Sequence, residues 1–166
     1  MCGVQLKSNN PITRESYRVA FARTIIADGD RNRNRATRDL YGVLEQYLEF
    51  HEINEQMDGA LNGCAPEALY DYETALLAVA GQRRFFVDEG GWIGLAPKWA
   101  LEGDNICLLF GGNVPFVLRD RGDGKYQFVG ECYVHGIMDG EIMKAAAGDR
   151  EVGGLLDDLI QEFTLT

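Results

Sequence analysis

Between Arg84 and Glu141, short apolar runs alternate with glycine-centred turns about every ten residues. This spacing is typical of a small all-β unit, because each run is long enough for one strand and each turn reverses the chain. Glycine and aspartate dominate the turns, since both tolerate positive φ at little steric cost. The pattern predicts strands at Arg84–Val87, Trp92–Ala96, Asn105–Phe110, Phe116–Arg119, Tyr126–Val129 and Glu131–Ile137.

A glycine also interrupts the apolar run near the end of this stretch, at Gly130. A glycine within a strand pattern indicates a bulge or a sharp bend. A sheet of short strands protects its edges best by closing on itself. We therefore predict a small, partly open antiparallel β-barrel. Its predicted core contains Cys107, Leu109, Val117 and Cys132, with no disulfide among them.

Helical patterns flank the strands. Apolar side chains recur at helical spacing in Pro11–Ala27, Thr37–Glu52 and Pro66–Ala80, and again in Leu155–Phe163 near the end of the chain. The sequence thus predicts an α+β fold with an N-terminal helical cluster packed on the barrel and a C-terminal helix. We divide it into a helical subdomain (1–81), the barrel (82–141) and a C-terminal helical tail (142–166). No Pro/Gly/Ser-rich linker separates helices from barrel, so we expect them to share an interface.

The charge balance excludes several classes of partner. The net charge is −10, which disfavours broad attraction to nucleic acid or to an anionic membrane. The basic stretch Asp30–Arg38 is the local exception, and we interpret it as a solvated loop in preference to a phosphate-binding patch. No apolar run approaches the roughly 20 residues of a membrane span.

The cysteines indicate a reducing compartment. Cys2, Cys64, Cys107 and Cys132 form no CxxC pair, so neither a disulfide framework nor a zinc site is expected. The N-terminus has no apolar segment of the secretory type. We therefore expect a cytoplasmic protein without metal or cofactor.

Resemblance to a known family is carried by three strings, RRFFVDEGGWIGLAP, GDNICLLFGGNVPFVLR and YQFVGECYVHGIMDGE. In order and spacing they resemble the C-terminal region of fungal heterokaryon incompatibility proteins. The upstream string ESYRVAFARTIIAD is similar to a further segment of that family. Ala96 stands where the family commonly has glycine, and Ala22 where it usually has an aromatic residue.

The resemblance implies a role in non-self recognition and programmed cell death. It also implies that the chain is either an excised C-terminal region or a short stand-alone relative. No nucleotide-binding, zinc-protease or serine-hydrolase fingerprint is present. The sequence therefore favours a non-catalytic module that senses, regulates or binds a protein partner. A small enzyme using His135 with Glu131 or Asp139, and a purely structural or oligomerisation module, are the alternatives.

The segment ECYVHGIMDGE concentrates the chemically active side chains. Cys132 and His135 are three positions apart, so in a regular strand they point to opposite faces and form no nucleophilic pair. The alternation assigns Cys132 and Val134 to the core, and we expect Asp139 to cap the following turn. The residues predicted to contact a ligand or partner are Glu131, Tyr133, His135, Asp139, Glu141 and Trp92. We further expect His135 and Asp139 to form a polar contact where the barrel meets the helices.

Overall fold

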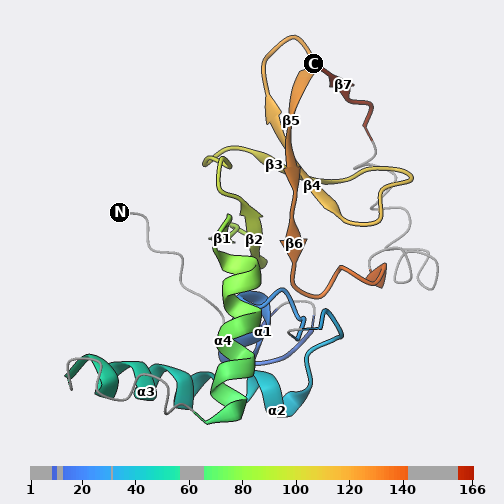
Figure 1. Ribbon diagram of the computed structural model, residues 1–166. Helices are drawn as coiled ribbons and strands as arrows, with labels where there is room; N and C mark the ends of the chain where they lie inside the picture. Colours follow the sequence, from blue (N-terminus) through green and yellow to red (C-terminus); the bar gives the residue numbers. More distant parts are fainter. Residues whose placement is uncertain (1–8, 11–12, 31, 57–65, 142–160) are drawn as a thin grey trace.

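The computed structural model describes residues 9–10, 13–30, 32–56, 66–141 and 161–166. The fold is α+β, as predicted, with the helices gathered at one end of the molecule and the strands extending from them (Figure 1). The helices are α1 (Tyr17–Thr24), α2 (Arg38–Tyr41), α3 (Leu44–Gln56) and α4 (Glu67–Ala80). The strands are β1 (Arg83–Val87), β2 (Ile93–Pro97), β3 (Asn105–Leu108), β4 (Pro115–Asp120), β5 (Lys125–Glu131), β6 (Tyr133–Val134) and β7 (Thr164–Leu165).

α1 is shorter than the predicted helix over Pro11–Ala27. Ser16 caps its first turn, and an isolated antiparallel bridge between Asn9 and Ser16 precedes it. Beyond the helix, Ala27 and Asp28 have φ values of 49° and 53°. Positive φ cannot continue a right-handed helix, so the chain turns sharply there.

The helix predicted from Thr37 to Glu52 is divided at Gly42. Thr37 caps α2, and Gly42 ends it before α3 begins at Leu44. Glycine costs a helix about 1 kcal/mol relative to alanine, which favours a break at this position. α3 extends to Gln56, four residues beyond the predicted end at Glu52, and residues 57–65 lie outside the described part. α4 agrees with the prediction at both ends.

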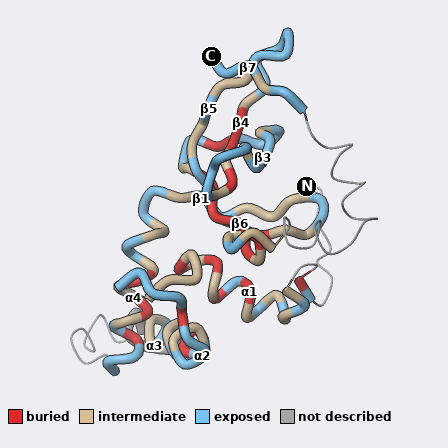
Figure 2. Tube along the Cα trace, turned by 90° about the vertical axis from the view of Figure 1, so that its right-hand side faces the viewer, coloured by how far each residue is buried: buried red, intermediate tan, exposed pale blue. Residues whose placement is uncertain are grey.

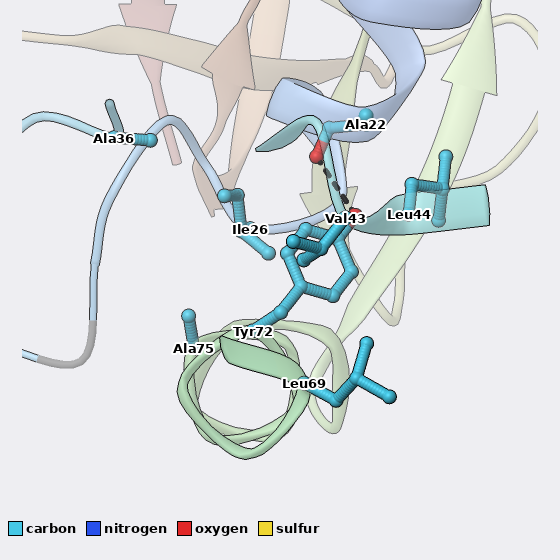
Figure 3. Packing of buried hydrophobic residues seen from close by; sticks show 8 residues of the cluster. All are labelled: Ala22, Ile26, Ala36, Val43, Leu44, Leu69, Tyr72 and Ala75. Atoms are coloured by element: carbon cyan, nitrogen blue, oxygen red, sulfur yellow. Dashed lines mark hydrogen bonds between the residues drawn. The ribbon is translucent and has the colours of Figure 1, made fainter. Parts of the chain in front are cut away.

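The helices enclose a hydrophobic cluster around Tyr72 (Figure 3). The Tyr72 ring is fully buried, and its hydroxyl donates a 3.0 Å hydrogen bond to the Ala22 carbonyl. Ile26 and Leu69 also lie in this cluster. The contact fixes α4 against α1.

α1 also contacts the strands, which confirms the predicted shared interface. The Tyr17 hydroxyl donates a 2.7 Å hydrogen bond to the Gly91 carbonyl, just before β2. The rings of Phe21 and Phe85 meet edge to face, with centroids 5.2 Å apart. α1 therefore lies between the helical cluster and the β1–β2 hairpin.

The strands form two sheets, ordered β1-β2-β6 and β3-β4-β5-β7. All pairs are antiparallel except β5 with β7, which is parallel. A bulge at Val129 shifts the β4–β5 register, since Val117 faces Gly130 while Leu118 faces Phe128. Gly130 has a φ of 150°, as expected for the predicted bend.

The predicted barrel is not closed within the described residues. β5 and β6 are almost continuous, so the chain passes from one sheet into the other at Cys132. β1 and β3 are left at the outer edges of the two sheets, and no described pairing joins them. Because the chain bends at Gly130, β5 and β6 belong to two different sheets. A regular strand would have continued in a single sheet.

A second hydrophobic core lies where the two sheets meet. Val117 and Cys132 are buried there, as predicted, and buried residues are drawn in red along β4 and β6 in Figure 2. Cys107 and Leu109 are only half-buried, because β3 is an edge strand. Cys107 and Cys132 are free thiols, in agreement with the prediction.

Most of the predicted C-terminal helix lies outside the described residues, which omit 142–160. Within the described part, Gln161–Phe163 are not helical, and β7 pairs with β5 instead. The Phe163 ring packs edge to face on Tyr126. None of the described helices combines the length and the apolar character needed to cross a membrane. The three-part division of the chain stays a prediction.

Candidate functional site

Four of the predicted contact residues line one open cavity beside α1 and β6. The cavity has a volume of ≈ 330 Å³ and contains Tyr133, His135, Asp139 and Glu141 in its wall. The other two predicted residues lie elsewhere. Glu131 is exposed and lines a neighbouring cavity, whereas Trp92 packs against the second core.

Three polar contacts fix His135, one through its backbone and two through its ring nitrogens. Its backbone N–H donates to the Ile93 carbonyl at 2.9 Å, which continues the β2–β6 pairing. Its Nε2 atom lies 2.9 Å from Glu15 Oε2, and its Nδ1 atom lies 3.1 Å from the Tyr133 hydroxyl. The side chain is 1 % exposed. Both ring nitrogens are thus occupied.

The surroundings of His135 determine its protonation. Burial lowers the pKa of His135, and the positive charge of Arg23 lowers it further, against the opposing effect of Glu15. Burial raises the pKa of Tyr133, so its hydroxyl keeps its proton. A neutral imidazole therefore accepts from Tyr133 at Nδ1 and donates from Nε2 to the Glu15 carboxylate.

Glu15 connects His135 to a buried arginine. Burial raises the pKa of Glu15, but hydrogen bonds from His135 and Arg23 outweigh it and the net shift is downward. Arg23 Nη1 donates to Glu15 Oε1 at 2.5 Å. On its other side Arg23 donates two hydrogen bonds, of 2.8 and 2.7 Å, to the carboxylate of Asp28. The hydrogen bond to Asp28 holds the pKa of Arg23 above its usual range despite burial.

Arg35 extends these contacts to the segment after β6. Its Nε atom lies 3.1 Å from Asp28 Oδ2, and its Nη1 atom donates to Asp139 Oδ2. We expected the Asp139 side chain to cap the following turn, but among the described residues its carboxylate is bound by Arg35. The Asp139 backbone N–H donates to the Glu141 carboxylate at 2.8 Å.

These contacts form one continuous series of side chains, called the polar chain below. Its members, in order, are Tyr133, His135, Glu15, Arg23, Asp28, Arg35 and Asp139. Within the described residues no hydrogen bond joins His135 directly to Asp139. The two predicted residues are linked through the N-terminal segment instead.

The four connecting residues, Glu15, Arg23, Asp28 and Arg35, were not predicted as site residues. A weak local signal exists for one pair, since Arg23 and Asp28 stand at the two ends of the string RTIIAD where α1 finishes. Glu15, which contacts His135, and Arg35, which contacts Asp139, are more than a hundred positions away from them in the sequence. No local pattern identifies contacts of that separation.

The basic stretch around Arg35 is folded on itself. Asp30 Oδ1 accepts hydrogen bonds from the backbone N–H groups of Asn32 and Asn34, both at 2.8 Å. An isolated bridge pairs Gly29 with Arg35. This turn directs the Arg35 guanidinium toward Asp28 and Asp139, so its charge is already balanced by carboxylates.

Among the described residues of the site, neither the thiol nor the phenol is activated as a nucleophile. Burial raises the pKa of the Cys132 thiol to about 12, and Cys132 makes no hydrogen bond with His135. The phenol of Tyr133 likewise has a raised pKa, whereas nucleophilic catalysis requires a lowered one. In the described part of the chain, no three His, Cys, Asp or Glu side chains gather closely enough to hold a metal ion.

Comparison with known proteins gives the family. The model of the Het-6 β-barrel domain matches residues 53–151. The chain is 36 % identical over 107 residues to heterokaryon incompatibility protein 6, OR allele, of Neurospora crassa. This alignment covers 61 % of the present chain but 16 % of the relative, so the chain spans a small part of that protein. No solved structure matches. The chain therefore belongs to the Het-6 β-barrel domain family and is a region related to fungal heterokaryon incompatibility proteins.

Proposed function

We propose that this chain is a non-catalytic protein-interaction module that acts in non-self recognition and programmed cell death. The observation that carries this proposal is a set of exposed apolar side chains in and around β3. Its members are Trp99, Leu101, Ile106, Leu108 and Phe110, of which Trp99 is 67 % and Phe110 83 % exposed. Large apolar groups gathered on a surface are typical of protein-binding sites, and aromatic residues contribute most to such interfaces.

The loop that presents Trp99 is rigid. Arg119 donates two hydrogen bonds to the Asp104 carboxylate, at 2.7 and 2.8 Å, and a third to the Trp99 carbonyl at 2.8 Å. Asp104 also accepts from the backbone N–H of Leu101 at 2.8 Å. Because these hydrogen bonds already hold the loop, binding a partner there costs the loop little conformational entropy. This preorganisation supports a binding role for the exposed side chains.

The enzyme alternative has one observation in its favour, the open cavity beside His135. The protonation pattern opposes it. A general base needs a free lone pair, and the His135 Nδ1 lone pair is engaged by Tyr133 while Nε2 donates to Glu15. The polar chain is better explained as the connection between the helical cluster and the strands. The arrangement therefore favours an interaction module over a small hydrolase or transferase.

A chimeric protein tests the proposal. The matching region of the Neurospora relative is replaced by this chain, and vegetative incompatibility is scored in transformants. We expect the unaltered chimera to be active and the Trp99→Ser, Phe110→Ser double variant to be inactive at unchanged melting temperature. A matched control, Leu77→Ser on α4, replaces an equally exposed apolar residue (69 %) and should retain activity. Full activity of the double variant would contradict the proposal.

A further inference from the structure

β3 carries apolar side chains that are exposed to solvent. It is the outer strand of its sheet, and none of the described strands pairs with its far side. Ile106 and Leu108 face the same side of the sheet as Val117 and Pro115, which are buried. Ile106 and Leu108 are nevertheless 38 % and 45 % exposed. The apolar side of this sheet thus continues to an edge strand whose side chains are exposed and that pairs with no further strand among the described residues.

This edge lacks the features that prevent strand pairing. The run from Asn105 to Phe110 contains no charged residue and no proline. Natural proteins protect exposed edge strands with such residues, because unpaired backbone groups otherwise pair with another chain. Asp104, which precedes β3, forms an ion pair with Arg119, so its charge does not prevent another strand from pairing with β3. The strand is therefore free to accept an additional antiparallel neighbour.

We propose that the neighbour is a second copy of this chain, paired antiparallel through β3 about a twofold axis at Cys107. The inference rests on the proposed interaction role and names the partner. In this register Ile106 of one copy faces Leu108 of the other, and Asp104 faces Phe110. No carboxylate meets a carboxylate along the strand, which matters for a chain of net charge −10.

The positions of the other exposed apolar residues favour self-pairing. Trp99 and Leu101 lie at the beginning of β3, where Asp104 and Arg119 hold their loop, and Phe110 follows its end. Antiparallel pairing brings the beginning of one β3 beside the end of the other. Each Phe110 then approaches the Trp99 loop of the partner copy. A single twofold contact thereby covers the whole exposed set, at both ends of the strand.

Sedimentation equilibrium of the purified chain, between about 1 and about 100 µM, tests for the dimer. We expect a monomer–dimer equilibrium in the unaltered chain. Hydrogen exchange at the two ends of this range supplies a readout that needs no substitution. The amides of Asn105–Leu108 should become more protected at high concentration, while those of β1 should not change. A monomer throughout the range, or β3 protection that ignores concentration, overturns the proposal.

Charge placed on the edge should prevent dimerisation. Ile106→Lys is expected to weaken dimerisation at least tenfold, because two lysines would meet the apolar side chains of the opposite copy. Leu77→Lys, an equally drastic change on the exposed face of α4, should leave the dimer intact. Unchanged dimerisation of a folded Ile106→Lys variant contradicts the β3 interface. Loss of the dimer in both variants contradicts it as well.

The two proposals fail separately. If the chain is monomeric but Trp99→Ser with Phe110→Ser still abolishes incompatibility in the chimera, the interaction role stands and the second copy is rejected. If the dimer forms through β3 but the chimera with Trp99→Ser and Phe110→Ser stays active, the dimer proposal is retained and the recognition role is rejected.

Discussion

Replacement of Arg23 by methionine should destabilise the fold strongly. Arg23 lies between the carboxylates of Glu15 and Asp28, and its side chain is 13 % exposed. Removing one member of a buried ion pair costs about 3–5 kcal/mol, because the remaining charge stays buried without a partner. Glu15 keeps some solvent contact and Asp28 keeps Arg35, so we expect the lower end, about 3 kcal/mol. For a chain of this size that corresponds to a fall in Tm of roughly 6–12 °C.

Urea denaturation followed by circular dichroism measures this loss. Arg18→Met is the matched control, since Arg18 lies on the same helix and pairs with Glu45 at an exposed site. Exposed pairs contribute about 0–1 kcal/mol, so the control should remain close to the unaltered protein. Adding Glu15→Gln to Arg23→Met should recover part of the loss, because the uncompensated carboxylate is removed while the oxygen facing His135 remains. Equal stability of the two single variants would refute the reasoning.

The other predictions concern pH, packing and charge. Since burial lowers the pKa of His135 in the folded state, the unfolded chain takes up the proton first as pH falls. The free energy of unfolding should therefore fall as pH decreases below about 6.5, by at most about 1.4 kcal/mol per pH unit from this group. His135→Gln should flatten that dependence in thermal melts at several pH values. Gly94→Ala should lower Tm by more than Gly81→Ala, because a Cβ at Gly94 would lie 2.2 Å from the Tyr133 carbonyl oxygen. Fluorescence anisotropy should detect no binding to duplex DNA at physiological salt, and a salt-sensitive micromolar complex would contradict the charge argument.

The positions of the strands were predictable because their signals are local. β1 to β5 each follow or precede a glycine- or aspartate-containing turn, and their limits lie within two residues of the predicted ones. β6 is shorter than the predicted last strand, and β7 was not predicted. The bulge near Gly130 was predictable for the same reason, since glycine tolerates the required φ. The division of the strands into two sheets, which follows from this bulge, was not predictable. Whether a bent strand closes a barrel or divides it depends on which edges meet, and strand order is not encoded in spacing.

Burial along β6 shows that sequence alternation cannot predict which face of a strand is covered by other parts of the chain. Alternation correctly placed Cys132 and Val134 in the core and placed Tyr133 and His135 on the other face. That face is also buried, because the N-terminal segment covers it through Glu15 and Arg23. The alternation rule gives the face of a residue but not what lies against it. The partners of His135 could be found only from the folded chain.

The polar chain joins residues that the family model matches to residues that lie outside the match. Tyr133, His135 and Asp139 lie within the residues matched by the Het-6 β-barrel domain, whereas Glu15 to Arg35 lie before them. An apolar contact between these parts would tolerate sliding, since hydrophobic burial has no direction. Paired charges with both guanidinium edges occupied, as at Arg23, accept one alignment only. The series of ion pairs therefore fixes how the helical segment sits on the strands, while the exposed residues around β3, on different elements, stay available for a partner.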